Sequence, residues 1–277
     1  APATLYLRLA TLSPDRVLPW ILEAAVRDCK LRAPGVAGQL LGMQAMRVLR
    51  DTSIGTLSAR VEQATALLNQ AERLDAQSVE LWARKGLLLL FVSSLPTTQP
   101  TIQPSMEAAE LQFKAIMERD KESVVGRIGL ALCSFKRLNY KQAGELFESL
   151  IAKAPVGSAW RREAQLAFAA CCSQLLPAGY EEAVRQYQLL LSTNRSDRDA
   201  LKGLGVLLVS PRGGLAVGGL QAVTEGLQLL RQYYTEHDRQ DPIVCMLLAD
   251  HFFYKGDLPK ATALATTALN FSGCNDQ

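Results

Sequence analysis

The sequence predicts an all-α protein, a right-handed α-solenoid of about six helical hairpins, on two observations. No segment alternates apolar and polar residues with the period of a β-strand. An apolar signature recurs instead: a small residue, a larger one four positions on, and another apolar residue three further, which together form one stripe of an α-helix. The six copies begin at positions 64, 109, 143, 183, 226 and 261, so they lie 45, 34, 40, 43 and 35 residues apart. They are Ala64, Leu68, Ala71; Ala109, Phe113, Ile116; Ala143, Phe147, Leu150; Ala183, Tyr187, Leu190; Gly226, Leu230, Tyr233; and Ala261, Ala265, Ala268.

The shortest interval, 34 residues, equals the tetratricopeptide (TPR) unit of two antiparallel helices. Such units stack along one continuous hydrophobic spine, so we expect a single domain over 1–277. The expected hairpins cover approximately 36–75, 78–121, 124–155, 158–195, 198–239 and 242–273. A proline-rich insertion at 94–104 and a glycine-rich insertion at 210–219 account for the two longest intervals.

The first elements follow from residues that cap and break helices. Ser13-Pro14 predicts the start of a helix that ends before Pro34. A second helix is expected from about 36 to 50, and the first helix that carries the signature from 60 to 74.

Later elements match the TPR pattern or a helix cap. Trp82 and Gly86 occupy the tryptophan and glycine positions of the pattern, and the glycine predicts a close approach of two helices. Ser196-x-x-Asp199 predicts a capping box at the start of the fifth hairpin. Pro242 predicts the start of the sixth.

Composition excludes several classes of function. The net charge of +3 is spread along the chain, so it does not predict nucleic-acid binding. The six cysteines, at 29, 133, 171, 172, 245 and 274, form no Cys-x-x-Cys pair, which favours buried, reduced thiols over zinc and indicates a reducing compartment. No apolar run is long enough to cross a membrane, and no secretory signal opens the chain. Because the chain begins Ala1-Pro2 and neither end reads as a polar capping helix, we expect a fragment of a longer protein.

No residue pattern predicts catalysis, a cofactor or a metal site. The glycine-rich segment 213–219 lacks the preceding strand and the Gly-Lys-Ser/Thr ending of a phosphate loop, so we expect a flexible loop between helices there. The two histidines, His237 and His251, have no neighbours that predict a triad or a metal site. We therefore expect a protein that is not an enzyme and takes no small-molecule substrate.

The positions that line the concave surface of a TPR array are mostly apolar here. In TPR proteins this surface is formed by positions 2, 5, 9, 12 and 13 of the first helices. An exposed apolar strip of that extent predicts a partner-binding surface, although the same residues would serve equally well to pack on neighbouring repeats or on helices from outside the fragment. The candidate partner-binding residues are Leu87, Ile128, Leu132, Phe135, Lys136, Lys202, Val206, Met246, Asp250, Phe253 and Tyr254, and Val209 shares the pattern.

The asparagines argue against one known mode of TPR binding. Co-chaperone TPR domains hold a terminal carboxylate with an asparagine at position 9 and nearby lysines. The five asparagines, at 69, 139, 194, 270 and 275, all fall elsewhere. A long apolar segment of a stable partner fits the predicted surface better.

Several segments, in the same order along the chain, resemble the large TPR subunit of the RNA polymerase II-associated factor (Paf) complex, the Ctr-nine family. The densest resemblance lies in TEGLQLL at 224–230 and LADHFFYK at 248–255, and LKGLGV at 201–206 and QATALL at 63–68 are also similar. The similarity extends at low identity over roughly residues 18 to 270. The two insertions depart from the family and suggest a divergent lineage.

The resemblance implies a nuclear, non-catalytic scaffold that holds other Paf subunits and RNA polymerase II, and supports transcript elongation and chromatin modification. It implies no cofactor and no catalytic residue. An alternative is a cytosolic TPR adaptor in trafficking or protein quality control. An RNA-binding helical repeat is disfavoured because no basic or polar position repeats once per unit.

Overall fold

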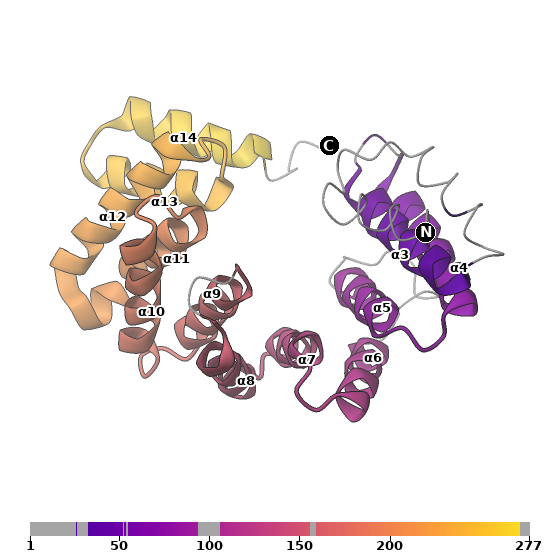
Figure 1. Ribbon diagram of the computed structural model, residues 1–277. Coiled ribbons are helices and arrows are strands. Elements are labelled where there is room, and N and C mark those ends of the chain that lie inside the picture. The colour runs from indigo at the N-terminus through magenta and orange to yellow at the C-terminus, as the bar shows by residue number, and fades with distance from the viewer. Residues whose placement is uncertain are drawn as a thin grey trace. The chain divides into compact units, whose positions relative to one another are not determined.

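A computed structural model describes residues 26, 33–51, 53, 55–93, 106–155 and 159–271. Every regular element among these residues is a helix, and most consecutive helices pack on one another (Figure 1). The predicted all-α fold of TPR-like hairpins is therefore confirmed for this part of the chain. The helix expected from Ser13-Pro14 and the insertion at 94–104 lie outside the described residues.

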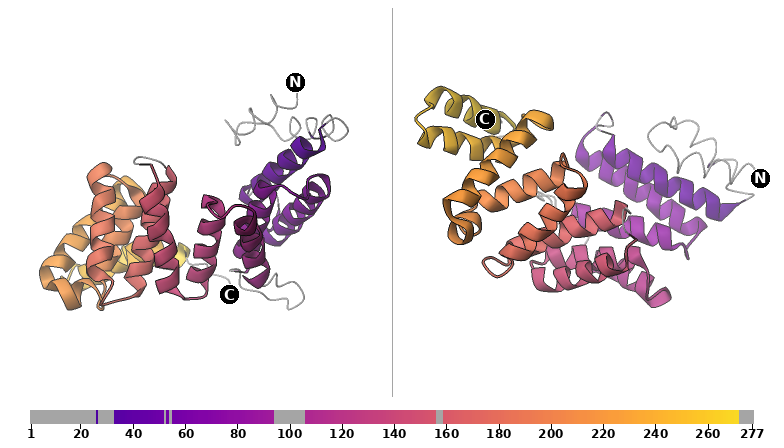
Figure 2. Two further views of the ribbon diagram at one scale, coloured as in Figure 1. Left: turned by 60° about the horizontal axis from the view of Figure 1, so that its bottom comes forward. Right: turned by 60° about the vertical axis from the view of Figure 1, so that its left-hand side comes forward.

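The chain folds as two compact units, 1–133 and 134–277, and the boundary falls near the end of one helix. In the first unit, α3 and α4 lie side by side in both views of Figure 2, and α5 packs on α6. The prediction of one continuous domain over 1–277 stays a prediction. The helices described from the first unit are α3 (Pro34–Arg50), α4 (Leu57–Leu74), α5 (Val79–Val92), α6 (Met106–Arg119) and α7 (Val124–Lys136), which crosses the boundary.

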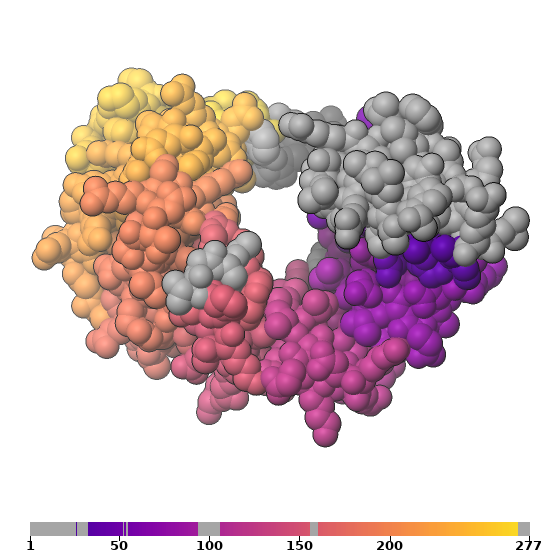
Figure 3. Space-filling view, viewed as in Figure 1, coloured from indigo at the N-terminus to yellow at the C-terminus, as the bar shows by residue number. Residues whose placement is uncertain are grey.

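The second unit continues the same pattern of paired helices. Each of α9, α11 and α13 packs on the helix that follows it, and α11 also contacts α9 and α13. The surfaces of these helices follow one another in chain order in Figure 3. The elements are α8 (Tyr140–Lys153), α9 (Ala159–Gln174), α10 (Tyr180–Thr193), α11 (Arg198–Val209), the π-helical turn η1 (Gly214–Gly218), α12 (Gly219–Glu236), α13 (Pro242–Tyr254) and α14 (Leu258–Phe271).

The apolar signature forms the core of both units. Every member of the six copies is buried except Ala265, which is partly buried against the last core cluster. Phe113 is fully buried, and its ring lies directly against Gly86 of α5 and Gly129 of α7. The close approach predicted at Gly86 is therefore present, and an aromatic side chain fills it.

Two local predictions need correction. Helix α4 begins at Leu57 rather than Arg60, because the Thr56 side chain caps it by accepting a hydrogen bond from the Ala59 N–H. The cap of α11 is Asp197, whose carboxylate accepts from the Ala200 N–H at 3.1 Å. The predicted capping box at Ser196 is wrong because its hydroxyl instead donates to Glu236 at 2.6 Å.

The glycine-rich insertion at 210–219 is not an irregular loop. It contains one turn of π-helix, η1, which runs directly into α12. The Ser210 side chain accepts from the Gly213 N–H at 2.9 Å, and Gly214 packs against the backbone of Leu208, where a side chain would not fit. The glycines therefore allow a tight turn against the end of α11.

Candidate functional site

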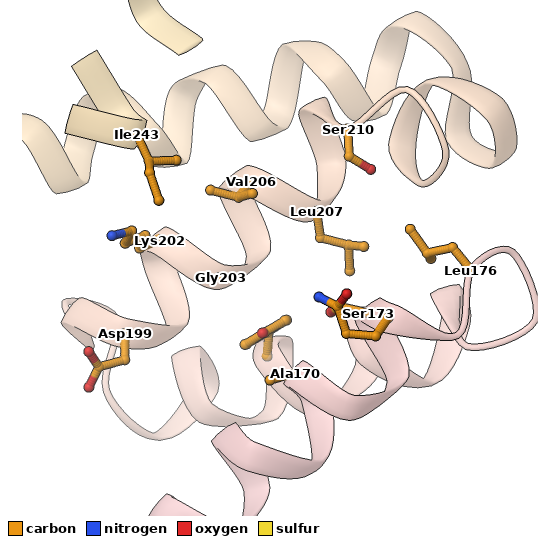
Figure 4. Close-up of a pocket in the computed structure, with 12 residues that line it drawn as sticks. Ala170, Ser173, Leu176, Asp199, Lys202, Gly203, Val206, Leu207, Ser210 and Ile243 are labelled. Atoms are coloured by element: carbon orange, nitrogen blue, oxygen red, sulfur yellow. The ribbon is translucent and has the colours of Figure 1, made fainter. Parts of the chain in front are cut away.

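A cleft of about 610 Å³ lies in the second unit, between α9, α11 and the start of α13. Figure 4 shows Leu207 of α11 pointing toward Ser173 of α9, with Ile243 of α13 at the opposite end. These are first helices of consecutive hairpins, so the cleft lies on the face that the TPR pattern makes concave. Its lining residues are Ala170, Ser173, Gln174, Leu176, Tyr187, Asp199, Lys202, Gly203, Val206, Leu207, Ser210 and Ile243.

Helical spacing explains how α11 contributes to this cleft. Asp199, Lys202 and Val206 are three and four residues apart, so they follow one stripe of the helix. Gly203 lies between them, and a Cβ there would come within 2.5 Å of the Tyr187 ring. The missing side chain thus lets the ring of α10 pack under α11 and form part of the cleft lining.

A row of apolar side chains on α13 continues from the cleft. Its members are exposed: Ile243 is 49% exposed, Met246 58%, Phe253 60% and Tyr254 86%. At about 100° per residue, these four side chains and Asp250 fall within an arc of about 100°. We call these five residues the α13 stripe.

Helix α13 is apolar on both sides but covered on only one. Its opposite face buries Val244, Cys245, Leu248 and Ala249 in the core of the second unit. A helix that is apolar all round is normally buried all round. The α13 stripe is therefore an apolar helix face that the described residues leave uncovered.

An arginine on α9 is bound to the cap of α11. The Arg162 guanidinium donates to both carboxylate oxygens of Asp197, at 2.7 and 2.8 Å, and to Asp199 Oδ2 at 2.8 Å. Burial raises the pKa of Asp197, but the hydrogen bonds from Arg162 and from the Ala200 N–H outweigh it, and the pKa is lowered overall. The hydrogen bonds that the guanidinium donates to these carboxylates also raise the pKa of Arg162.

The next pair of first helices repeats this arrangement. Lys202 of α11 donates through Nζ to Asp241 Oδ2 at 2.5 Å, and Asp241 caps α13 through the N–H groups of Ile243 and Val244. The Tyr233 hydroxyl donates to the same carboxylate oxygen at 2.9 Å. The cations of the cleft are thus already paired with carboxylates of this chain, which leaves the cleft lining mainly apolar.

The predicted partner-binding residues divide between the two units. Leu87 and Ile128 belong to the first unit, where Leu87 is 38% exposed and Ile128 is partly buried. Leu132 packs against the core cluster around Phe113, so it also serves the interior. At the start of the second unit, the Phe135 ring contacts the Tyr140 ring edge-on, with the ring centroids 5.2 Å apart, and Lys136 is exposed.

In the second unit, the structure brings several of the predicted residues together. Lys202 and Val206 line the cleft, and Met246, Asp250, Phe253 and Tyr254 lie in the α13 stripe. Val206 and Val209 also pack partly against the core of the unit.

Sequence reasoning missed other members of the site. Ile243 could have been predicted, because it holds position 2 of the sixth hairpin, one of the concave positions. Leu176 comes from the turn between α9 and α10, and Tyr187 from a second helix, so no concave-position rule could find them.

The described residues contain no cluster of three or more histidine, cysteine or acidic side chains that could hold a metal ion. His251 Nε2 lies 2.8 Å from the Arg231 guanidinium, and burial together with Arg231 and Lys255 lowers its pKa. In the same part of the chain no single helix is long and apolar enough to cross a membrane. Helix α11 and the segment Gly214–Glu236 meet that criterion only as a pair, bent by 62°.

The hairpins, their buried signature and the cleft between first helices define a helical-repeat protein of the TPR type. No family model matches the chain. It is similar to the RNA polymerase-associated protein CTR9 of Caenorhabditis elegans, with 22% identity over 265 residues, or 92% of this chain. The chain spans 21%, about a fifth, of the length of that relative.

Two solved structures give further likenesses. The structure of Naa15/Naa10 bound to HypK-THB has a TM-score of 0.41 and 17% identity, covering 98% of this chain and 37% of that one. The P58(IPK) TPR domain has a TM-score of 0.35 and 14% identity, covering 89% of this chain and 65% of that one.

Proposed function

We propose that this chain is a non-catalytic protein-interaction scaffold whose second unit binds a segment of a partner protein along the cleft and the α13 stripe. The observation that carries this proposal is the uncovered apolar face of α13, continuous at Ile243 with the apolar cleft. Contiguous exposed apolar surface is typical of sites where proteins bind one another.

The dimensions of the cleft suit anchoring side chains. A volume of about 610 Å³ lies within the range of small-molecule and side-chain pockets. The first helices that form it are joined by the capping ion pairs Arg162–Asp197 and Lys202–Asp241, which hold the surface in one shape before binding. A partner then meets a preorganised surface, so little entropy is lost on the scaffold side.

Substitution of Phe253 tests this placement. Phe253→Asp should abolish partner binding without unfolding the chain, because the side chain is 60% exposed. Leu269→Asp on α14 is a matched control, since Leu269 is also 60% exposed but lies off the α13 stripe. Pull-down of native partners by the two variants makes the comparison. Equal recovery by both would place the binding surface elsewhere.

The same proposal has a more specific form. The similarity to CTR9 over most of the chain, and the ordered segments at 201–206, 224–230 and 248–255, support a nuclear scaffold of the Paf type. Such a scaffold would hold other Paf subunits on RNA polymerase II and support elongation and chromatin modification. The alternative remains a cytosolic TPR adaptor in trafficking or quality control.

Affinity purification of the full-length tagged protein from its native cells, followed by mass spectrometry, separates these alternatives. Recovery of Paf subunits together with polymerase subunits, and a nuclear location by microscopy, is the expected result. Recovery of chaperones or vesicle proteins without polymerase factors would favour the adaptor. It would mean that the resemblance to the Paf subunit reflects only shared TPR architecture.

A further inference from the structure

The charge around the cleft and the α13 stripe is opposite in sign to that of the whole chain. Six charged residues line the cleft, form its capping ion pairs or lie in the α13 stripe. Two are cations, Arg162 and Lys202, and four are carboxylates, Asp197, Asp199, Asp241 and Asp250. These six residues therefore carry an excess of two negative charges, whereas the whole chain carries a net charge of +3.

Of these four carboxylates, Asp197, Asp199 and Asp241 form ion pairs with cations of the chain, and Asp250 is the remaining one. It holds position 9 of the sixth hairpin, in the middle of the α13 stripe, with Met246 one turn before it and Tyr254 one turn after. It is exposed, and among the described residues no ion pair or hydrogen bond involves its carboxylate. Lys255, the nearest cation in sequence, points away from the stripe by the helical spacing of 100° per residue.

This position constrains what can cover the stripe. A purely apolar partner segment that buried Met246 and Tyr254 would also remove Asp250 from water. Burying a charge without a partner is costly, whereas a cation placed opposite restores its interactions. An acidic partner, or the phosphates of a nucleic acid, would instead be repelled by the excess negative charge.

We propose that the α13 stripe binds a basic, amphipathic helical segment of a partner protein. In this segment a lysine or arginine faces Asp250, and apolar residues about one turn to either side contact Met246 and the Phe253–Tyr254 pair. Arginine fits best because its guanidinium binds a carboxylate through two hydrogen bonds. This inference rests on the proposed function, and adds the sign of the partner's charge and the spacing of its anchors.

Selection from a random 14-residue peptide library on phage, panned on the full chain, tests this chemistry. We expect the wild-type chain to enrich peptides with a basic residue three or four positions from apolar residues. One enriched peptide, synthesised with a fluorescent label, then serves as the probe. Asp250→Asn should weaken its binding by at least about tenfold, because it neutralises one partner of a covered charge pair. Asp250→Lys should weaken it further.

Two controls separate charge from folding. Glu225→Gln neutralises an exposed carboxylate on α12, away from the stripe, and should leave the affinity unchanged. Circular dichroism melts of the Asp250 variants should match those of the wild type, because the side chain is exposed. Binding should also weaken as salt is raised from 50 to 500 mM in the wild type, but less in Asp250→Asn.

The outcomes distinguish this inference from the proposed function. Enriched peptides that are neutral or acidic, bind with unchanged affinity to Asp250→Asn, and are lost in Phe253→Asp would overturn the charge assignment and keep the binding surface. If no peptide enriches, or if enriched peptides bind Phe253→Asp as well as the wild type, then both the surface and the inference fail.

Discussion

Asp241 illustrates how one buried carboxylate joins three elements. It caps α13, accepts the Lys202 ammonium of α11 and accepts the Tyr233 hydroxyl of α12. Burial alone raises its pKa, but the hydrogen bonds from Lys202, the Val244 N–H and Tyr233 outweigh burial and lower the pKa overall. Because the folded-state pKa is lower than in the unfolded chain, the ionised carboxylate stabilises the fold at neutral pH.

This linkage predicts a pH-dependent effect of Asp241→Asn. The variant should lose about 1–3 kcal/mol of unfolding free energy at pH 7, since the cap acceptor remains but the charge does not. The contribution is present above the unfolded pKa of about 3.9 and is lost as pH falls through the lower folded pKa. Urea unfolding from pH 7 to pH 2.5 should therefore show the two proteins converging at acid pH.

Asp250→Asn is the matched control for this measurement. It removes an exposed carboxylate from the same helix and should change stability by less than about 0.5 kcal/mol at every pH. A constant difference between Asp241→Asn and the wild type down to pH 2.5 would contradict the linkage.

Gly129 illustrates packing that tolerates no side chain. A Cβ at this position would overlap the Phe113 ring, which is fully buried. Gly129→Ala should therefore destabilise the chain by about 1–3 kcal/mol, although alanine favours helix by about 1 kcal/mol.

Gly144→Ala provides the opposite case in α8. The nearest atom to its Cβ would be Phe168 Cε2 at 3.5 Å, an ordinary contact. This variant should be neutral or stabilising by up to about 1 kcal/mol. Thermal unfolding of both variants makes the comparison, and equal midpoints would show that the ring of Phe113 moves aside without cost.

At the scale of single elements, α9 confirms the predicted state of its thiols. All four described cysteines, Cys133, Cys171, Cys172 and Cys245, are buried thiols. Burial and the neighbouring Cys172 raise the pKa of Cys171 to about 12, and burial with nearby Glu182 and Glu148 raises that of Cys172 to about 11. Cys29 and Cys274 lie outside the described residues.

These pKa values predict inert thiols in the folded chain. At pH 8, iodoacetamide should modify Cys171 and Cys172 at least about 100-fold more slowly than in 6 M urea, because the thiolate is the reactive form. Pulse labelling with peptide mass spectrometry measures each site. Rapid modification of either thiol under native conditions would indicate that α9 opens frequently.

The sequence predicted the existence of the helices more accurately than it predicted where they end or how they pack. Periodicity predicted every described α-helix because the buried stripe is local and repeats. The capping-box pattern placed the cap of α11 one residue early. Ser196 and Asp197 are both good caps, and contact with Arg162 decides between them. Periodicity also gave no sign of η1, which depends on how Gly214 packs on Leu208.

At the scale of the whole molecule, the chain divides into units 1–133 and 134–277. Arrays of repeats are stabilised mainly by contacts between neighbours, so distant parts can unfold separately. We therefore expect two urea transitions. Trp82 reports on the first unit and Trp160 on the second when the other tryptophans are replaced by phenylalanine.

Gly129→Ala makes this expectation specific. It should lower the midpoint reported by Trp82 more than the one reported by Trp160, because the Phe113 contact lies in the first unit. Coincident transitions, shifted equally by the substitution, would mean that the two units unfold as one.

The helical class, the repeat and the buried stripe of each hairpin could be predicted from the sequence, because they depend on local spacings along the chain. The sequence also placed on first helices Lys202, Val206 and four members of the α13 stripe, Met246, Asp250, Phe253 and Tyr254. Which of these residues meet could not be predicted in the same way, since it depends on the packing of one hairpin on the next. That packing paired Lys202 with Asp241, turned Leu132 toward the core and left Asp250 exposed among apolar side chains.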